Sequence, residues 1–200
     1  MHGPQVRQRL FIQIGSSTEY GKKKGPLKEE MRCNPKTPYA IAKNLCTNIL
    51  INLNKKKGFP VVILRLFQAY GPGQDENRLL PYIIKKCKKN LSFNTTLGEQ
   101  LCDFCHIDDV VSAIFKCFAS KKINGQILNI SSGEPRMIKS IILRVKKIIG
   151  KGNPIFGGLK YNKQISMKNF ASINKAKRIL NWSPKVKFLD GLKKTIDSYK

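Results

Sequence analysis

The residues with the clearest chemical potential are a tyrosine and a lysine four positions apart. Tyr39 and Lys43 stand in the segment Tyr-Ala-Ile-Ala-Lys, and side chains at positions i and i+4 of a helix lie on the same face. A nearby ammonium favours the phenolate, so it lowers the pKa of a tyrosine from about 10 toward the range of a general base. The pair therefore predicts proton transfer at a substrate hydroxyl or carbonyl group.

A group of hydroxyl side chains precedes this pair. Residues 15–21 read Gly-Ser-Ser-Thr-Glu-Tyr-Gly and follow the apolar run Leu10–Ile14. Ligands bind at the strand ends of open parallel sheets, where such hydroxyls can hydrogen-bond a substrate alcohol or carbonyl held beside the tyrosine. Tyr-x-x-x-Lys alone is a weak signal, but its combination with this segment favours a catalytic site over two surface residues.

Short apolar runs alternate along the chain with helical periods. We expect strands at 10–14, 61–64 and 126–130, and helices at 39–56, 78–90, 108–120, 138–149, 174–180 and 190–199. Val61–Leu64 is uninterrupted and mostly β-branched, which is typical of a strand covered on both faces. Strands and helices in alternation predict an α/β fold with a mainly parallel sheet.

The composition is that of a globular protein with an extreme charge. Lys and Arg number 38 against 12 Asp and Glu, which gives a net charge of +26 spread along the whole chain. The six cysteines, the lack of a secretory signal and the lack of an 18-residue apolar run indicate a reduced, cytoplasmic chain that does not span a membrane.

Several blocks of the sequence carry recognisable patterns in a fixed order. They are Ser16–Gly21, Tyr39 with Lys43, Arg65–Gly73, Leu97–Val110, Asn129–Gly133 and Lys175–Pro184. Together they resemble the extended short-chain dehydrogenase/reductases, specifically the NAD-dependent nucleotide-sugar epimerases, dehydratases and 4-ketoreductases. The resemblance implies the C-terminal part of a Rossmann-like doubly wound parallel sheet plus a small mixed α/β substrate-binding domain.

The resemblance also divides the chain and implies its activity. Residues 1–75 would be the remnant of the NAD-binding Rossmann domain with the catalytic Ser and Tyr/Lys, and residues 76–200 the substrate domain, interleaved with the sheet. The implied activity is epimerase or 4-ketoreductase chemistry on a nucleotide-diphosphate sugar, by hydride transfer to or from NAD or NADP. The complete enzyme is expected to be a homodimer.

The family's functional residues fall on definite positions of this chain. Tyr39 would be the acid/base, Lys43 would hydrogen-bond the nicotinamide ribose, and Ser16, with Thr18 as a second candidate, would be the catalytic hydroxyl. The implied cofactor contacts are Tyr39, Lys43 and Phe67. The implied substrate contacts are Gln68, Tyr70, Arg78 and Cys102.

Some positions depart from the family pattern. Ser17 and Thr18 stand where dehydratases have an Asp-Glu pair, which disfavours dehydration. Cys102 stands where the family usually has an arginine on the substrate diphosphate, and a neutral thiol cannot replace that contact. The Gly-x-x-Gly-x-x-Gly dinucleotide fingerprint does not occur in the sequence. The alternative expectation is therefore a truncated, inactive fragment that needs a partner.

Other interpretations are less favoured. Cys102-Asp-Phe-Cys105-His106 matches a haem-attachment pattern, but without an export signal we favour a buried strand with two structural thiols, and we expect no redox or metal site. His106 is expected to be structural or substrate-adjacent, and Asp108 and Asp109 to cap a helix. Trp182 is predicted to be a packing anchor. The charge of +26 leaves a polyanion- or nucleic-acid-binding protein as a further alternative, although no recognition motif supports it.

Overall fold

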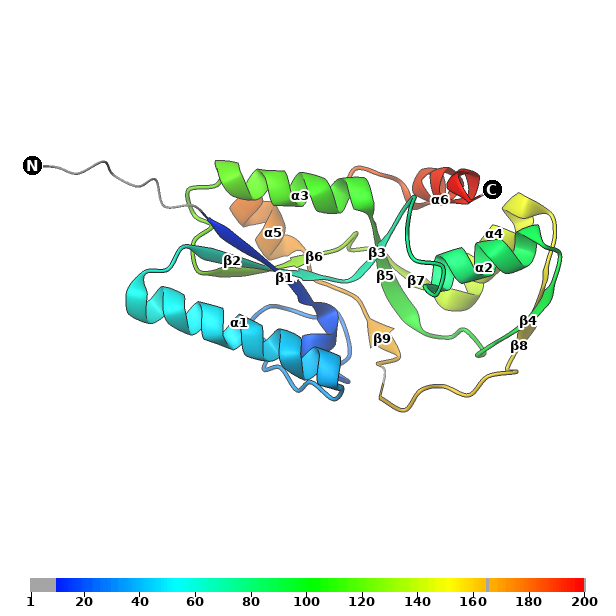
Figure 1. The fold of residues 1–200 in the computed structure, drawn as a ribbon, viewed down its shortest axis with the longest axis horizontal. Coiled ribbons are helices and arrows are strands. Elements are labelled where there is room, and N and C mark those ends of the chain that lie inside the picture. Colours follow the sequence, from blue (N-terminus) through cyan, green and yellow to red (C-terminus); the bar gives the residue numbers. More distant parts are fainter. Residues whose placement is uncertain (1–9, 165, 200) are drawn as a thin grey trace, which may run out of the picture.

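The computed structural model describes residues 10–164 and 166–199. One end of the molecule is a three-stranded parallel sheet in the order β1-β2-β6, formed by β1 (Phe11–Ser16), β2 (Val61–Leu66) and β6 (Gln126–Ile130). Helix α1 (Pro38–Lys57) lies along one face of this sheet, and α3 (Ile107–Ala119) and α5 (Asn174–Leu180) cover the other (Figure 1). The α/β fold predicted from the sequence is confirmed.

The core of this part lies between the sheet and the helices α3 and α5. Residues Val61–Leu64 of β2 are fully buried, as predicted for a strand covered on both faces. Trp182 is 3 % exposed, packs in this core, and donates a hydrogen bond from Nε1 to Ser112 Oγ at 2.8 Å. Its predicted role as a packing anchor is confirmed.

The other end of the molecule is built around three helices and a strand (Figure 1). The helices are α2 (Leu79–Lys88), α4 (Ile138–Ile149) and α6 (Phe188–Ser198), and they pack on β5 (Leu101–His106). Strand β5 pairs with β3 (Gln68–Tyr70), β7 (Pro135–Met137) and β9 (Lys168–Asn169), while β4 (Ser92–Thr95) pairs with β8 (Asn153–Phe156). Apart from β5, these short strands were not predicted, since strands of two to four residues carry no periodic signal.

The two cysteines of β5 belong to different cores. Cys102 packs with α2, α4 and α6, whereas Cys105 packs with β2 and α3. Both thiols are buried and free, which confirms the prediction of two structural thiols on a buried strand. Among the described residues, no group of three or more His, Cys, Asp or Glu side chains is placed to hold a metal ion, and no helix is long and apolar enough to span a membrane.

The start of α3 differs from its prediction. His106 is the N-cap, and its Nδ1 accepts a hydrogen bond from the Asp108 amide at 3.3 Å. Asp109 is buried and instead accepts hydrogen bonds from the amides of Lys185 and Val186, at 2.8 and 3.1 Å. The Asp109 carboxylate therefore fixes the segment before α6 to α3 rather than capping the helix. The predicted complement to the helix dipole is present, because Asp108 and Asp109 both lie in the first turn of α3.

Another buried carboxylate joins the two ends of the molecule. Asp103 on β5 is fully buried and accepts hydrogen bonds from the amides of Ser132 at 2.9 Å, Gly133 at 3.0 Å and Ala171 at 3.4 Å, and from the Ser132 hydroxyl. Ser132 and Gly133 follow β6, and Ala171 follows β9. One side chain thus ties the three-stranded sheet to β5.

Replacing this carboxylate should destabilise the fold. Asp103→Ala leaves the buried amides without an acceptor, so we expect the free energy of unfolding in urea to fall by roughly 3 kcal/mol. The matched control is Asp197→Ala, which removes an exposed carboxylate from α6 and should change stability by less than about 0.5 kcal/mol. Equal losses for the two variants would contradict the role given to Asp103.

Candidate active site

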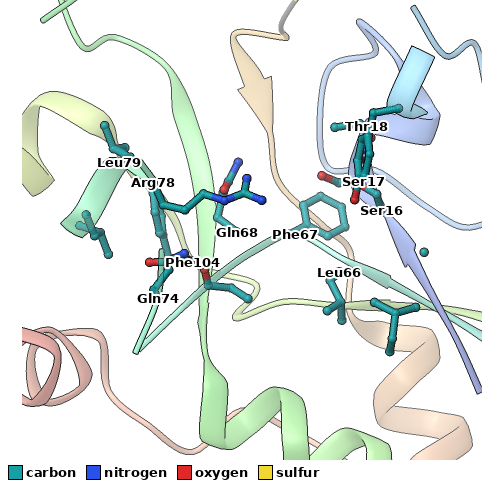
Figure 2. Close-up of a pocket in the computed structure, with 15 residues that line it drawn as sticks. Ser16, Ser17, Thr18, Leu66, Phe67, Gln68, Gln74, Arg78, Leu79 and Phe104 are labelled. Carbon is teal, nitrogen blue, oxygen red and sulfur yellow. Dashed lines mark hydrogen bonds between the residues drawn. The ribbon is translucent and has the colours of Figure 1, made fainter. Parts of the chain in front are cut away.

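A cavity of about 510 Å³ opens between the carboxyl end of the three-stranded sheet and the start of α2 (Figure 2). Its walls come from the end of β1, the first turn of α1, the connection from β2 to β3, and β5. The lining residues are Ile14, Gly15, Ser16, Ser17, Thr18, Tyr39, Leu66, Phe67, Gln68, Ala69, Gln74, Arg78, Leu79, Leu80 and Phe104. Strand ends and a helix start thus meet in one hollow, the usual position of a ligand site in an open parallel sheet.

The cavity brings together most of the site residues predicted from the sequence. They are Ser16, Thr18, Tyr39, Phe67, Gln68 and Arg78. Figure 2 shows Ser16, Ser17 and Thr18 on one wall and Arg78 on the other, with Phe67 and Gln68 between them. The chain segments that carry them are far apart in the sequence, so the fold assembles the group.

Tyr39 and Lys43 lie on the first turns of α1. The helix begins with Thr37 as its N-cap, whose Oγ1 accepts a hydrogen bond from the Ala40 amide at 3.2 Å. Tyr39 is 58 % exposed and lines the cavity. Lys43 Nζ donates to the Ile14 carbonyl at 2.9 Å and lies 5.8 Å from the centroid of the Tyr39 ring. The ammonium is therefore anchored on β1 next to the tyrosine, although Lys43 does not line the cavity.

Two predicted substrate contacts lie in the core instead. Tyr70 is 2 % exposed, packs against Phe104 and Phe188, and donates from its hydroxyl to the Phe188 carbonyl at 3.3 Å. Cys102 is buried among the residues of α2, α4 and α6. Neither residue lines the cavity. Burial raises the pKa of both groups, that of Cys102 to about 11 with a contribution from Asp103, so both are neutral at pH 7.

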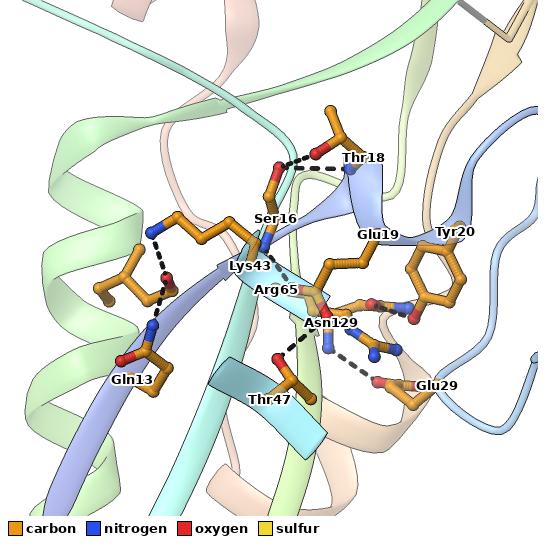
Figure 3. Close-up of polar contacts among 11 residues, drawn as sticks. Gln13, Ser16, Thr18, Glu19, Tyr20, Glu29, Lys43, Thr47, Arg65 and Asn129 are labelled. Carbon is orange, nitrogen blue, oxygen red and sulfur yellow. Dashed lines mark hydrogen bonds and ion pairs between the residues drawn. The ribbon is translucent and has the colours of Figure 1, made fainter. Parts of the chain in front are cut away.

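The hydroxyls of Ser16 and Thr18 are held by a short 3₁₀ turn, η1 (Ser17–Tyr20) (Figure 3). Ser16 is its N-cap: Oγ accepts from the Thr18 amide at 3.2 Å and lies 2.8 Å from Thr18 Oγ1. In return, Glu19 Oε1 accepts from the Ser16 amide at 2.8 Å. This reciprocal capping box fixes where Ser16 and Thr18 stand at the cavity wall.

The sequence motifs did not identify Glu19, whose side chain holds several elements of the site in place. It is fully buried, and its Oε2 accepts hydrogen bonds from Thr47 Oγ1 and from Arg65 Nε, both at 3.0 Å (Figure 3). A Cβ at position 15 would lie 2.7 Å from Glu19 Oε1, so only glycine fits beside this carboxylate. The signal was present as Ser-x-x-Glu, the sequence pattern of a capping box.

The arginine of this pair is also enclosed. The Arg65 guanidinium lies 4.7 Å from the centroid of the Tyr20 ring. Tyr20 donates from its hydroxyl to Asn129 Oδ1 at 2.8 Å, and burial raises its pKa to about 12. Tyr20 is therefore a neutral structural phenol, and Tyr39 is the exposed phenol at the cavity.

Sequence reasoning missed several lining residues. They are Leu66, Gln74, Leu79, Leu80 and Phe104. Gln74 donates from Nε2 to the Ala69 carbonyl at 2.8 Å, and nothing in its local pattern marks it. The apolar members have the same sequence signature as core residues, so only the fold separates them from the core.

The chain is similar in sequence to known nucleotide-sugar enzymes. The chain is 28 % identical over 194 residues to the UDP-glucuronate 4-epimerase of Thermodesulfobacterium geofontis, covering 94 % of this chain and 58 % of that protein. It is 26 % identical over 201 residues to the dTDP-4-dehydro-6-deoxyglucose reductase of Escherichia coli, covering 96 % of this chain and 61 % of the reductase. The chain thus spans about six tenths of these relatives.

A solved structure shows the same fold. The UDP-glucuronic acid 4-epimerase of Bacillus cereus, determined in complex with UDP-glucuronic acid and NAD, superposes with a TM-score of 0.90 and 31 % identity. The match covers 97 % of this chain and 62 % of the epimerase, and it confirms the predicted Rossmann-like architecture.

The sequence itself assigns the family. Residues 3–131 match the model of the NAD dependent epimerase/dehydratase family, and this segment holds every lining residue of the cavity, from Ile14 to Phe104. The family resemblance expected from the motifs is confirmed: the chain belongs to the NAD-dependent epimerase/dehydratase family.

Proposed function

We propose that this chain supplies the proton-transfer and sugar-binding groups of an NAD(P)-dependent nucleotide-sugar epimerase or 4-ketoreductase. The observation that carries the proposal is the cavity in which the Ser16 and Thr18 hydroxyls meet Tyr39, with Lys43 anchored beside the tyrosine. The family membership and the nucleotide-sugar relatives support it.

Each of these side chains has a distinct task in the proposed reaction. Tyr39 exchanges a proton with the sugar hydroxyl or carbonyl, and the Lys43 ammonium stabilises the negative charge that develops on the phenolic oxygen. Ser16 and Thr18 hydrogen-bond the same sugar oxygen and keep it within reach of Tyr39. Dehydratases of the family have an Asp-Glu pair where this chain has Ser17 and Thr18. This difference favours epimerase or reductase chemistry over dehydration.

The proposal assigns cofactor contacts only for the nicotinamide end of NAD(P). Tyr39, which is half exposed, and Phe67 both line the cavity, so they fit as contacts of a nicotinamide riboside. Lys43, beside Tyr39, is the third contact that the family resemblance implies. A bound nicotinamide cofactor would supply the acceptor and donor of hydride. The sequence contains no Gly-x-x-Gly-x-x-Gly segment, and the proposal assigns no residue to the pyrophosphate or the adenosine.

The apolar stripe of α1 supports the proposed homodimer. The stripe consists of Ile41, Leu45, Ile49 and Leu53, which are 42–59 % exposed although they recur at helical spacing. Helix α1 buries only Ala40 and Thr47, so the face that predicted the helix does not face the core. Two copies of α1 packed through this stripe would remove the apolar surface from water.

The division at residue 75 and the cytoplasmic location stay predictions. The proposed interleaving requires that elements after residue 75 belong to the three-stranded sheet and its cover. These elements are strand β6 and helices α3 and α5.

The acid/base role of Tyr39 is tested by removing its hydroxyl. In the natural full-length protein, Tyr39→Phe should lower kcat for UDP-sugar epimerisation or 4-keto reduction by roughly 10²- to 10⁴-fold. Binding of NAD and of the UDP-sugar should be unchanged, since the ring is kept. Tyr82→Phe is the matched control, on α2 outside the cavity. A Tyr39→Phe enzyme at the wild-type rate would exclude the proposed role.

The dimer is tested by charging the stripe. Leu45→Lys, at a position 54 % exposed, should convert the protein from dimer to monomer in analytical ultracentrifugation, because two lysines would face each other across the interface. Leu143→Lys, at a position 45 % exposed on α4, changes the same residue type away from the stripe and should leave the dimer intact. A Leu45→Lys protein that sediments like the wild type would rule out this interface.

A further inference from the structure

The carbonyl oxygen of Ile14 accepts hydrogen bonds from two side chains. Lys43 Nζ donates at 2.9 Å and Gln13 Nε2 at 3.3 Å, and Figure 3 shows the two side chains meeting there. Strand β1 ends the three-stranded sheet on one side, and the Phe11 amide donates to the Pro60 carbonyl beside β2. Because the direction of the hydrogen bonds alternates from residue to residue along a strand, the Ile14 carbonyl points to the outer edge of the sheet.

The Lys43 ammonium lies outside the cavity in which the proposed chemistry needs it. Its Nζ is 5.8 Å from the centroid of the Tyr39 ring, and Lys43 does not line the cavity. In the proposed function this ammonium stabilises charge on the phenolic oxygen and contacts the nicotinamide ribose. To do so, Nζ has to leave the Ile14 carbonyl and turn into the cavity, a movement that the flexible four-carbon stem of a lysine permits.

This movement would be costly if it left the carbonyl without a donor. Ile14 is half-buried, and a carbonyl that loses its hydrogen-bond partner on the way into the protein loses free energy. Gln13 removes most of this cost, because its amide can stay on the carbonyl after the lysine has turned. A carbonyl oxygen has two lone pairs, so the amide and the ammonium can also bind it together.

We propose that Gln13 is a positioning residue for Lys43, which holds the Ile14 carbonyl while the ammonium turns toward Tyr39 and the nicotinamide ribose. The inference rests on the proposed function and adds a residue that sets the balance between two positions of the lysine. Gln13 does not line the cavity, so its whole effect on a ligand passes through Lys43.

The balance between the two positions determines the affinity for the cofactor. A ligand that contacts only the turned lysine binds more weakly in proportion to the fraction of protein in which Lys43 stays on the Ile14 carbonyl. Removing the Gln13 amide raises this fraction, because the carbonyl then depends on the ammonium alone.

The test measures the dissociation constant of NAD by calorimetry, and kcat, for the natural full-length protein and its variants. Gln13→Leu removes the amide and should weaken NAD binding by about 2- to 10-fold, the effect of one hydrogen bond, with a similar fall in kcat. Gln13→Glu cannot donate and attracts the ammonium, so it should give a larger loss. The control Gln126→Leu removes a half-buried amide from β6, outside the cavity, and should leave both values unchanged.

A double-mutant cycle separates positioning of the lysine from a general structural role. Lys43→Met removes the ammonium, so Gln13→Leu should cause no further loss of NAD affinity in the Lys43→Met protein. An equal loss with and without the ammonium, or no loss with the lysine present, would overturn the inference and leave the proposed function standing. A Lys43→Met protein with the NAD affinity and kcat of the wild type would overturn both.

Discussion

The buried carboxylate of Glu19 sets the geometry on which the candidate site depends. Its three donors come from three elements: the Ser16 amide at the end of β1, the Thr47 hydroxyl on α1 and the Arg65 guanidinium on β2. An ionised carboxylate without these partners would be costly to bury, so the elements are held where all three donors reach it. Because desolvation offsets much of the attraction in a buried ion pair, the main effect of this contact is positional.

This positional effect reaches Tyr39 and Lys43 through α1. Thr47 lies two turns after Tyr39 on the same helix. Its hydrogen bond to Glu19 fixes the position of α1 along the sheet. Lys43, between them, is fixed in turn by the Ile14 carbonyl. The capping box around Ser16 is completed by the same Glu19 side chain. Hydroxyls and tyrosine therefore share one anchor, and Gly15 leaves the space for it. Asp103 has the same role at another wall of the cavity. Its hydrogen bonds hold β5 in place, and the next residue of that strand, Phe104, lines the cavity.

The sequence allowed the larger elements and part of the site to be predicted. Apolar patterns located α1, β2 and α4. Ser16, Tyr39 and Arg78, which the family resemblance implied as site residues, line one cavity in the structure. Cys102 and Tyr70 are different: a motif position does not say which face of a strand a side chain occupies, and both turn into the core. The stripe of α1 shows the same limit for helices, because periodicity reveals an apolar face but not the surface that covers it.

The net charge of +26 and the single guanidinium of the cavity act on different length scales. A charge spread over the surface attracts any anion and raises its local concentration, but this attraction falls off within a Debye length of about 8 Å at physiological salt. It gives no orientation to a bound anion. Arg78 is the only charged side chain among the described residues that line the cavity, and it presents its donors in a fixed plane that acts at hydrogen-bond distance. The basic composition that suggested a polyanion-binding protein therefore adds long-range attraction for anions of any kind, while the described lining of the cavity presents one charged side chain opposite the hydroxyl wall.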